Sequence, residues 1–180
     1  MPARETLVVS PAPALARDPD IARWLWVLED NRRRLLEAVD GLPDAHVDWR
    51  SREGESSIGS LLYHIALIEL DWVCAEVLEQ EGYPPALAAR FPHDVRDTAG
   101  RLTHVAGVPL AGHLDRLAAV RSHLVETFRD MSIDEFRRVR ALPEYDVTPE
   151  WVLYHLLEHE AEHRGQIGSL RDAARAAGVA

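Results

Sequence analysis

Four long segments of this 180-residue chain repeat their apolar side chains every three to four positions, and this periodicity restricts the chain to a largely helical fold. The segments cover about residues 18–39, 56–78, 109–128 and 148–177. Ser56 or Ser57 can cap the second segment, and Thr148 followed by Pro149 is typical of a helix start. Strand signals are weak everywhere, so the pattern predicts an all-α protein.

The connection between the second and third segments is long and rich in proline and glycine. Residues 81–108 contain three prolines and three glycines, which predicts an irregular crossover with a short helix near residues 85–90. Another short helix is expected near residues 133–139. Together these features favour an antiparallel four-helix bundle over residues 18–180, preceded by a flexible N-terminal tail over residues 1–17.

The charge of the chain restricts the class of partner. There are 30 acidic and 20 basic residues, and every basic residue is an arginine, so the formal net charge is -10. Such an acidic chain is not expected to bind a nucleic-acid backbone or an anionic membrane surface. Because the sequence has no lysine, a Schiff-base lysine is excluded as a catalytic group.

The N-terminal apolar run and the cysteine content both bear on location. Pro11 and Pro13 interrupt that run, so a signal peptide is not expected. No segment is expected to provide the roughly 20 apolar residues that cross a bilayer. Cys74 is the single cysteine, which excludes an intrachain disulfide and makes the cytoplasm the expected location. A buried structural thiol is the expected role of Cys74.

The last segment contains three histidines at a spacing that suits metal binding. His155, His159 and His163 lie four residues apart, so successive pairs share one helix face and can chelate one ion. The outer two lie roughly 12 Å apart along the axis, so all three cannot easily bind one ion. His64, in the otherwise apolar stretch 61–67, is the best candidate for a third ligand, because an imidazole there requires a polar partner. The alternative is a set of surface or core histidines with local hydrogen bonds.

The string from His159 to His163 also matches the HExxH pattern of zinc peptidases, in which the glutamate, here Glu160, acts as general base. The extended pattern has glycine and histidine where this chain has Gln166 and Ser169. No strand is expected to hold a peptide substrate, so peptidase activity is a minor alternative. Glu160, like its two acidic neighbours, is expected on a solvated face or beside an imidazole.

Two segments of the chain resemble the DinB-like, also called YfiT-like, superfamily of four-helix-bundle metalloproteins. They are residues 57–64 and 155–167, on the second and fourth expected helices. The second segment contains the string His-x3-His-Arg-Gly-Gln, which is fairly specific to that group. The resemblance implies a divalent metal held by His64, His159 and His163, whereas His155 matches a position that is usually not a ligand.

The resemblance also implies a kind of chemistry, because members of this superfamily include transferases and isomerases that use bacillithiol, mycothiol or related thiols. The leading hypothesis is a metal-dependent thiol S-transferase that acts on small electrophiles, with a low-molecular-weight thiol as cosubstrate. The alternatives are metal-hydroxide-dependent hydrolysis of a small amide or ester, and a non-catalytic, stress-associated metal-binding module. A homodimer is implied by the resemblance alone, and no catalytic residue is assigned.

A site of three histidines leaves at least one coordination position open. Zn or Ni is expected first, with Fe, Mn or Co as alternatives. Because the ligands must be deprotonated, release of the metal is expected below about pH 6. Arg164 is expected to pair with a nearby acid rather than with a substrate carboxylate, and Gln166 to form a hydrogen bond near the site.

Overall fold

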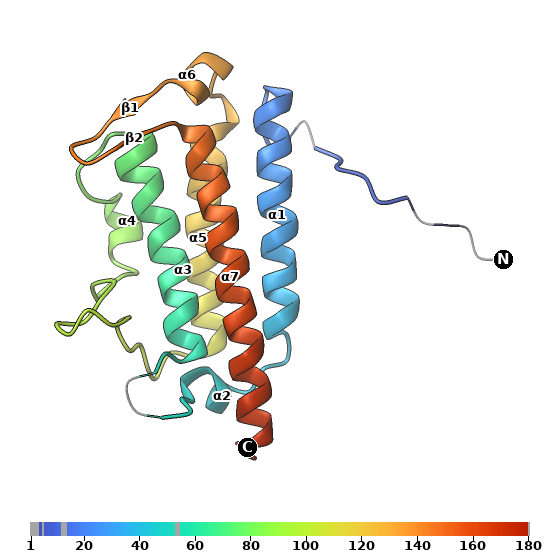
Figure 1. Ribbon diagram of the computed structural model, residues 1–180, viewed down its shortest axis with the longest axis vertical. Coiled ribbons are helices and arrows are strands. Elements are labelled where there is room, and N and C mark those ends of the chain that lie inside the picture. The colour runs from blue at the N-terminus through green and yellow to red at the C-terminus, as the bar shows by residue number, and fades with distance from the viewer. Residues whose placement is uncertain (1–3, 5, 12–13, 53–54, 180) are drawn as a thin grey trace.

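The computed structural model describes residues 4, 6–11, 14–52 and 55–179, and four long helices dominate this part of the chain (Figure 1). They are α1 (Pro19–Val39), α3 (Ile58–Trp72), α5 (Leu110–Arg129) and α7 (Pro149–Ala176). α3 continues directly into a π-helical turn, η1 (Val73–Val77). These bounds agree closely with the four periodic segments, so the predicted all-α fold is confirmed.

Side-chain caps explain where these helices begin. The Asp18 carboxylate accepts from the Asp20 N–H (2.9 Å) at the start of α1. The Ser57 hydroxyl accepts from the Ser60 N–H (3.1 Å) at the start of α3. The Thr148 hydroxyl accepts from the Trp151 N–H (3.2 Å) at the start of α7, in front of a first-turn proline. Each cap satisfies a backbone donor that has no partner within its own helix.

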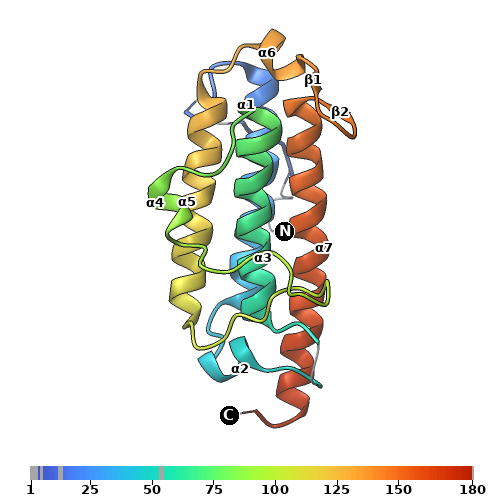
Figure 2. The same ribbon diagram turned by 90° about the vertical axis from the view of Figure 1, so that its left-hand side faces the viewer.

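The helices run in two directions. α1 and α7 run from the top to the bottom of Figure 1, whereas α3 and α5 run the opposite way (Figure 2). At one end the Arg17 N–H donates to the Arg129 carbonyl (3.0 Å), which joins the start of α1 to the end of α5. α3 is therefore antiparallel to α7 and parallel to α5. Parallel α3 and α5 require a crossover along the bundle, which is the long connection that the sequence predicts.

The connections between the long helices contain several short elements. They are α2 (Asp44–Asp48), α4 (Pro85–Ala88), α6 (Ile133–Arg137), β1 (Arg140–Ala141) and β2 (Asp146–Val147). α4 and α6 lie where short helices are predicted, whereas α2 and the hairpin of β1 and β2 are not predicted. The strands pair antiparallel, with Arg140 opposite Val147. A two-residue strand is too short to show the alternation from which strands are predicted.

The crossover packs against α3 and α5. The Tyr63 hydroxyl of α3 donates to the His93 carbonyl (2.6 Å) and accepts from the His93 N–H (3.0 Å). Arg116 Nε of α5 donates to the Arg90 carbonyl (2.9 Å), and its guanidinium carbon lies 4.9 Å from the centre of the Tyr63 ring. These hydrogen bonds attach an otherwise irregular segment to two rigid helices.

The predicted tail over residues 1–17 falls partly on residues 1–3, 5 and 12–13, which lie outside the described residues. Among the described residues before α1, Leu7, Val8 and Val9 are exposed and belong to no helix or strand. The helical part of the chain begins at Pro19, directly after the Asp18 cap.

α3 is a core helix. Twelve of its 15 residues are buried, among them His64. The span Ile58–Val77 is long and apolar enough to cross a membrane, so the prediction that no segment would qualify is wrong. However, 78% of its most apolar window is buried inside the bundle, as expected of a helix with neighbours on all sides.

Each long helix contributes one residue to a buried charge cluster. The four residues are Arg32 (α1), Glu69 (α3), Arg121 (α5) and Glu160 (α7). Arg32 Nη2 lies 2.8 Å from Glu69 Oε2 and 2.9 Å from Glu160 Oε2. Arg121 Nη2 lies 2.9 Å and 3.0 Å from the same two oxygens. The charges of these four residues balance, and each carboxylate contacts both guanidinium groups, as buried charges require.

The two arginines of this cluster control the pKa of Glu69 and the position of Glu160. Burial would raise the pKa of Glu69, but Arg121 and Arg32 outweigh burial and hold that pKa below its ordinary value. Glu160 is only 1% exposed, so the expectation of a solvated Glu160 is wrong. Its carboxylate points into the bundle because two arginines from other helices bind it there.

Candidate metal centre

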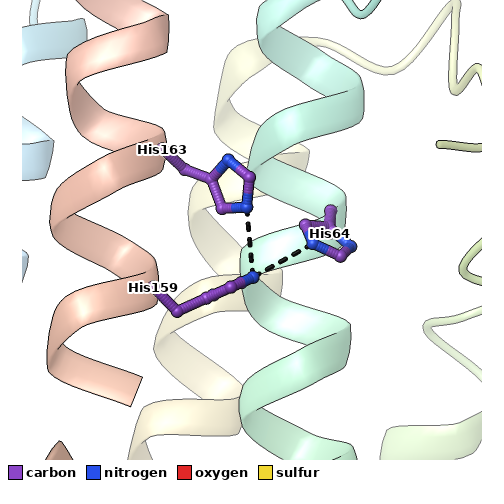
Figure 3. Close-up of side chains that lie close together, drawn as sticks. All are labelled: His64, His159 and His163. Atoms are coloured by element: carbon purple, nitrogen blue, oxygen red, sulfur yellow. Dashed lines mark hydrogen bonds between the residues drawn. The ribbon is translucent and has the colours of Figure 1, made fainter. Parts of the chain in front are cut away.

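Three imidazoles from two helices converge between α3 and α7 (Figure 3). Nε2 of His159 lies 3.0 Å from Nε2 of His64 and 3.1 Å from Nε2 of His163. One ring nitrogen from each residue lies within 4.8 Å of the others, so the group can hold a metal ion. The structure thus brings together the three residues that the sequence proposes as ligands.

Two local features place these rings. His159 and His163 are one turn apart on α7, so both project from the same face. His64 projects from α3, which runs antiparallel beside α7. Glu160 follows His159 in the sequence and points about 100° away around the helix axis. Because Glu160 is bound inside the bundle, it favours the rotation of α7 that turns His159 towards His64.

The protonation of the rings fits a divalent cation. His163 Nδ1 lies 3.0 Å from Gln166 Oε1, and an amide oxygen only accepts, so this hydrogen bond needs a proton on Nδ1. The neutral tautomer that donates it keeps the Nε2 lone pair for a metal. Burial and the neighbouring His163 lower the pKa of His64 to about 4 and that of His159 to about 3. His64 and His159 are therefore neutral at pH 7, as metal ligands must be.

These pKa values change the expected pH dependence of metal binding. A proton competes with the metal at each ligand only near the pKa of that ligand, and burial places the pKa values of His64 and His159 at about 4 and about 3 rather than at the ordinary 6.5. We therefore expect protons not to displace the metal from His64 and His159 at pH 6, and release of the metal to be complete only as the pH falls towards about 4. Metal content after dialysis at a series of pH values measures this. Release that is complete at pH 6 would contradict the low pKa values.

Gln166 is confirmed as a hydrogen-bonding neighbour of the site. Replacing Gln166 with leucine removes the acceptor that orients the His163 ring, and we expect metal affinity to fall about 10- to 100-fold. Competition with a chromophoric chelator measures the affinity. Ser169→Ala, on the same helix, is the matched control, because the Ser169 hydroxyl donates to the Gly165 carbonyl and to no other group among the described residues. Equal affinities of the two variants would contradict a role for Gln166.

His155 lies outside the three-histidine group, as the resemblance to the DinB-like superfamily implies. Its ring stacks on Trp151, with centres 5.3 Å apart and planes at 5°, and lies 4.2 Å from the centre of the Trp72 ring. The centre of the His159 ring is 5.9 Å away. His155 is thus an aromatic neighbour between the three-histidine group and two tryptophans.

Three other expectations are decided by the structure. Glu160 is bound by Arg32 and Arg121, so it cannot serve as the general base of an HExxH mechanism. Arg164 donates to the Asn31 side-chain oxygen (2.7 Å), so the expected pairing of Arg164 with an acid is wrong. Cys74 is 1% exposed, which confirms a buried thiol.

The fold and this site define a helical bundle with three histidines that can hold a metal ion. A model of the DinB superfamily matches residues 27–167, and the chain belongs to that superfamily. The match begins within α1 and ends within α7, so it includes all three histidines of the site. No curated protein is similar enough to this chain to give a match.

Proposed function

We propose that this protein is a divalent-metal-dependent S-transferase in which His64, His159 and His163 hold the ion. Its cosubstrate is a low-molecular-weight thiol of the bacillithiol or mycothiol type, and its second substrate is a small electrophile. The main support is the three-histidine group, which can hold a metal ion. Glu160, the glutamate of the HExxH string, is held in buried ion pairs with Arg32 and Arg121, so it is not free to act as the general base of a peptidase. A divalent ion, with Zn or Ni expected first, lowers the pKa of a bound thiol and keeps it as the thiolate.

The nucleophilic sulfur has to come from outside the chain. Cys74 is the single cysteine, it is 1% exposed, and burial raises the pKa of its thiol. In the proposed reaction a carbon–sulfur bond forms at the electrophilic carbon, and the bond from that carbon to the leaving group breaks. The proton leaves the thiol for solvent when the thiolate forms, and the leaving group departs later with the electron pair of its broken bond, so the overall reaction releases the leaving group and one proton.

The residues around the site have defined tasks in this proposal. His64 and His159 are kept neutral by burial, so they offer lone pairs at physiological pH. Gln166 holds the His163 ring in the matching tautomer. His159 and His163 are only partly buried, which leaves the centre accessible to a thiol and an electrophile.

The test is a thiol-transfer assay with metal-free and metal-loaded protein. Bacillithiol or mycothiol is supplied with an aryl halide electrophile, and the thioether product is measured. We expect the product to form faster with the metal-loaded protein and not with its His159→Ala variant. A rate no greater than that of the metal-free protein would contradict the transferase.

The same experiment separates the alternatives. Turnover of a small ester or amide without added thiol would indicate the hydrolase instead. Tight metal binding with neither activity would indicate a metal-binding module.

A further inference from the structure

A cavity of about 510 Å³ lies at the end of the bundle where α7 begins. Its walls include Trp72 at the end of α3, Trp151 in the first turns of α7, and Tyr145 and Asp146 from the hairpin. This volume is in the range of small-molecule binding sites. The three-histidine group is a separate feature, two turns further along α7.

Three of the seven described residues that line this cavity are aromatic. The centre of the Trp72 ring lies 5.6 Å from that of Trp151 and 6.3 Å from that of Tyr145. Trp151 is 46% exposed and Tyr145 is 44% exposed, although large aromatic side chains are stabilised by burial. Exposed aromatic surface gathered around a cavity is typical of a binding site.

The lining of the cavity has acidic rather than basic character. Asp146 is the one charged residue among the described residues that line the cavity, and none of them is an arginine. Behind the wall, the Tyr145 hydroxyl donates to Glu76 Oε1 (2.9 Å), so the phenol cannot donate to a ligand. Glu76 is 8% exposed, and its Oε2 has no hydrogen-bond partner among the described residues. The negative faces of aromatic rings and a nearby carboxylate together attract a positive charge.

We infer that this cavity binds an organic cation, of the alkylammonium or quaternary ammonium class, on the faces of Trp72, Trp151 and Tyr145 with Asp146 as counter-ion. A neutral apolar ligand would gain no attraction from Asp146, and an anion would be repelled by its negative charge. The net charge of -10 also favours a cationic ligand over an anionic one.

The position of the cavity links it to the three-histidine group. The His155 ring lies 4.2 Å from Trp72 and 5.9 Å from His159, centre to centre, and so lies between the two sites. Trp151 and His159 are eight residues apart on one helix, which is about 12 Å. Resting on the proposed function, this proximity would let the cationic group of the electrophile lie in the cavity while its reacting carbon lies at the three-histidine group.

Choline and 3,3-dimethylbutan-1-ol, its uncharged isostere, test the charge preference. Isothermal titration calorimetry and tryptophan fluorescence are measured on the full chain. Choline is expected to bind and the neutral isostere to bind much more weakly. Asp146→Asn should weaken choline binding about fivefold, whereas Asp172→Asn, an equal charge change at the far end of α7, should not. Trp151→Leu should abolish binding, and its circular dichroism shows whether it is folded.

The outcomes are distinct from those of the transferase test, because binding is measured without metal. The His64→Ala variant should bind choline as the unmodified protein does, even if no transferase activity is found. Equal affinity for choline and its neutral isostere would overturn the proposal. So would no binding of choline at millimolar concentrations, or an Asp146→Asn variant that binds choline as tightly as the Asp172→Asn variant.

Discussion

Replacing His159 with alanine is expected to remove nearly all metal from the protein. His159 Nε2 is the central donor of the group, at 3.0 Å and 3.1 Å from the nitrogens of His64 and His163. Loss of a residue that merely orients a ligand costs about 10- to 100-fold in affinity, so loss of this donor should cost at least about 100-fold. Mass spectrometry of metal content and competition with a chromophoric chelator measure the effect.

His155→Ala is the matched control for this experiment. It removes the same side chain from the same helix, one turn earlier, and His155 is not in the three-histidine group. This variant should keep its metal, although it loses the stacking on Trp151. Equal metal loss in the two variants would mean that the effect is not specific to a ligand. Full metal retention in His159→Ala would place the site elsewhere.

Replacing Glu160 with alanine is expected to lower the free energy of unfolding by about 3–5 kcal/mol. The change leaves Arg32 and Arg121, both within 3.0 Å of Glu160 Oε2, with Glu69 as their remaining fully buried counter-ion. The loss is large beside a total stability of about 5–15 kcal/mol for a domain. Urea unfolding of the metal-free protein, followed by circular dichroism, measures it without a contribution from bound metal.

Glu162→Ala provides the control for the stability measurement. Glu162 is exposed on the same helix, and its removal should change the free energy of unfolding by no more than about 0.5 kcal/mol. If Glu160→Ala unfolds at the same urea concentration as Glu162→Ala, the buried cluster does not stabilise the bundle.

The buried charge cluster is the largest feature that the sequence did not indicate. Glu69 lies within an apolar helical stretch, and its position on the buried face could have identified it as a buried acid. For Glu160, however, the commonest environment of a glutamate in an acidic helix is solvent. Its partners Arg32 and Arg121 lie 128 and 39 residues away in the chain, so no local pattern links them to it.

The aromatic cavity could not be predicted from the sequence for a related reason. Tyr145 reaches Glu76 and the neighbouring Trp72 through the hairpin, whose strands have two residues each. So short a pairing leaves no alternation in the sequence. The hairpin is therefore known only from the folded chain, and so is the cavity that it helps to form.

The features that the sequence determined by itself depend on residues close together in the chain. Apolar periodicity and capping residues predict the four long helices and their ends, because both depend on neighbours within a few positions. The spacing of His155, His159 and His163 likewise predicts two chelating pairs on one helix face. That spacing alone does not say which pair binds; only the resemblance to the DinB-like superfamily favours the second.

Only the tertiary structure shows which of the two histidine pairs on α7 meets His64. The rotation of α7 and its axial position against α3 decide which pair meets His64, and both depend on packing between helices. In the folded chain His64 meets His159 and His163, and His155 stacks on Trp151 instead. Contacts between helices depend on side chains far apart in the sequence, so only the assembled bundle determines them.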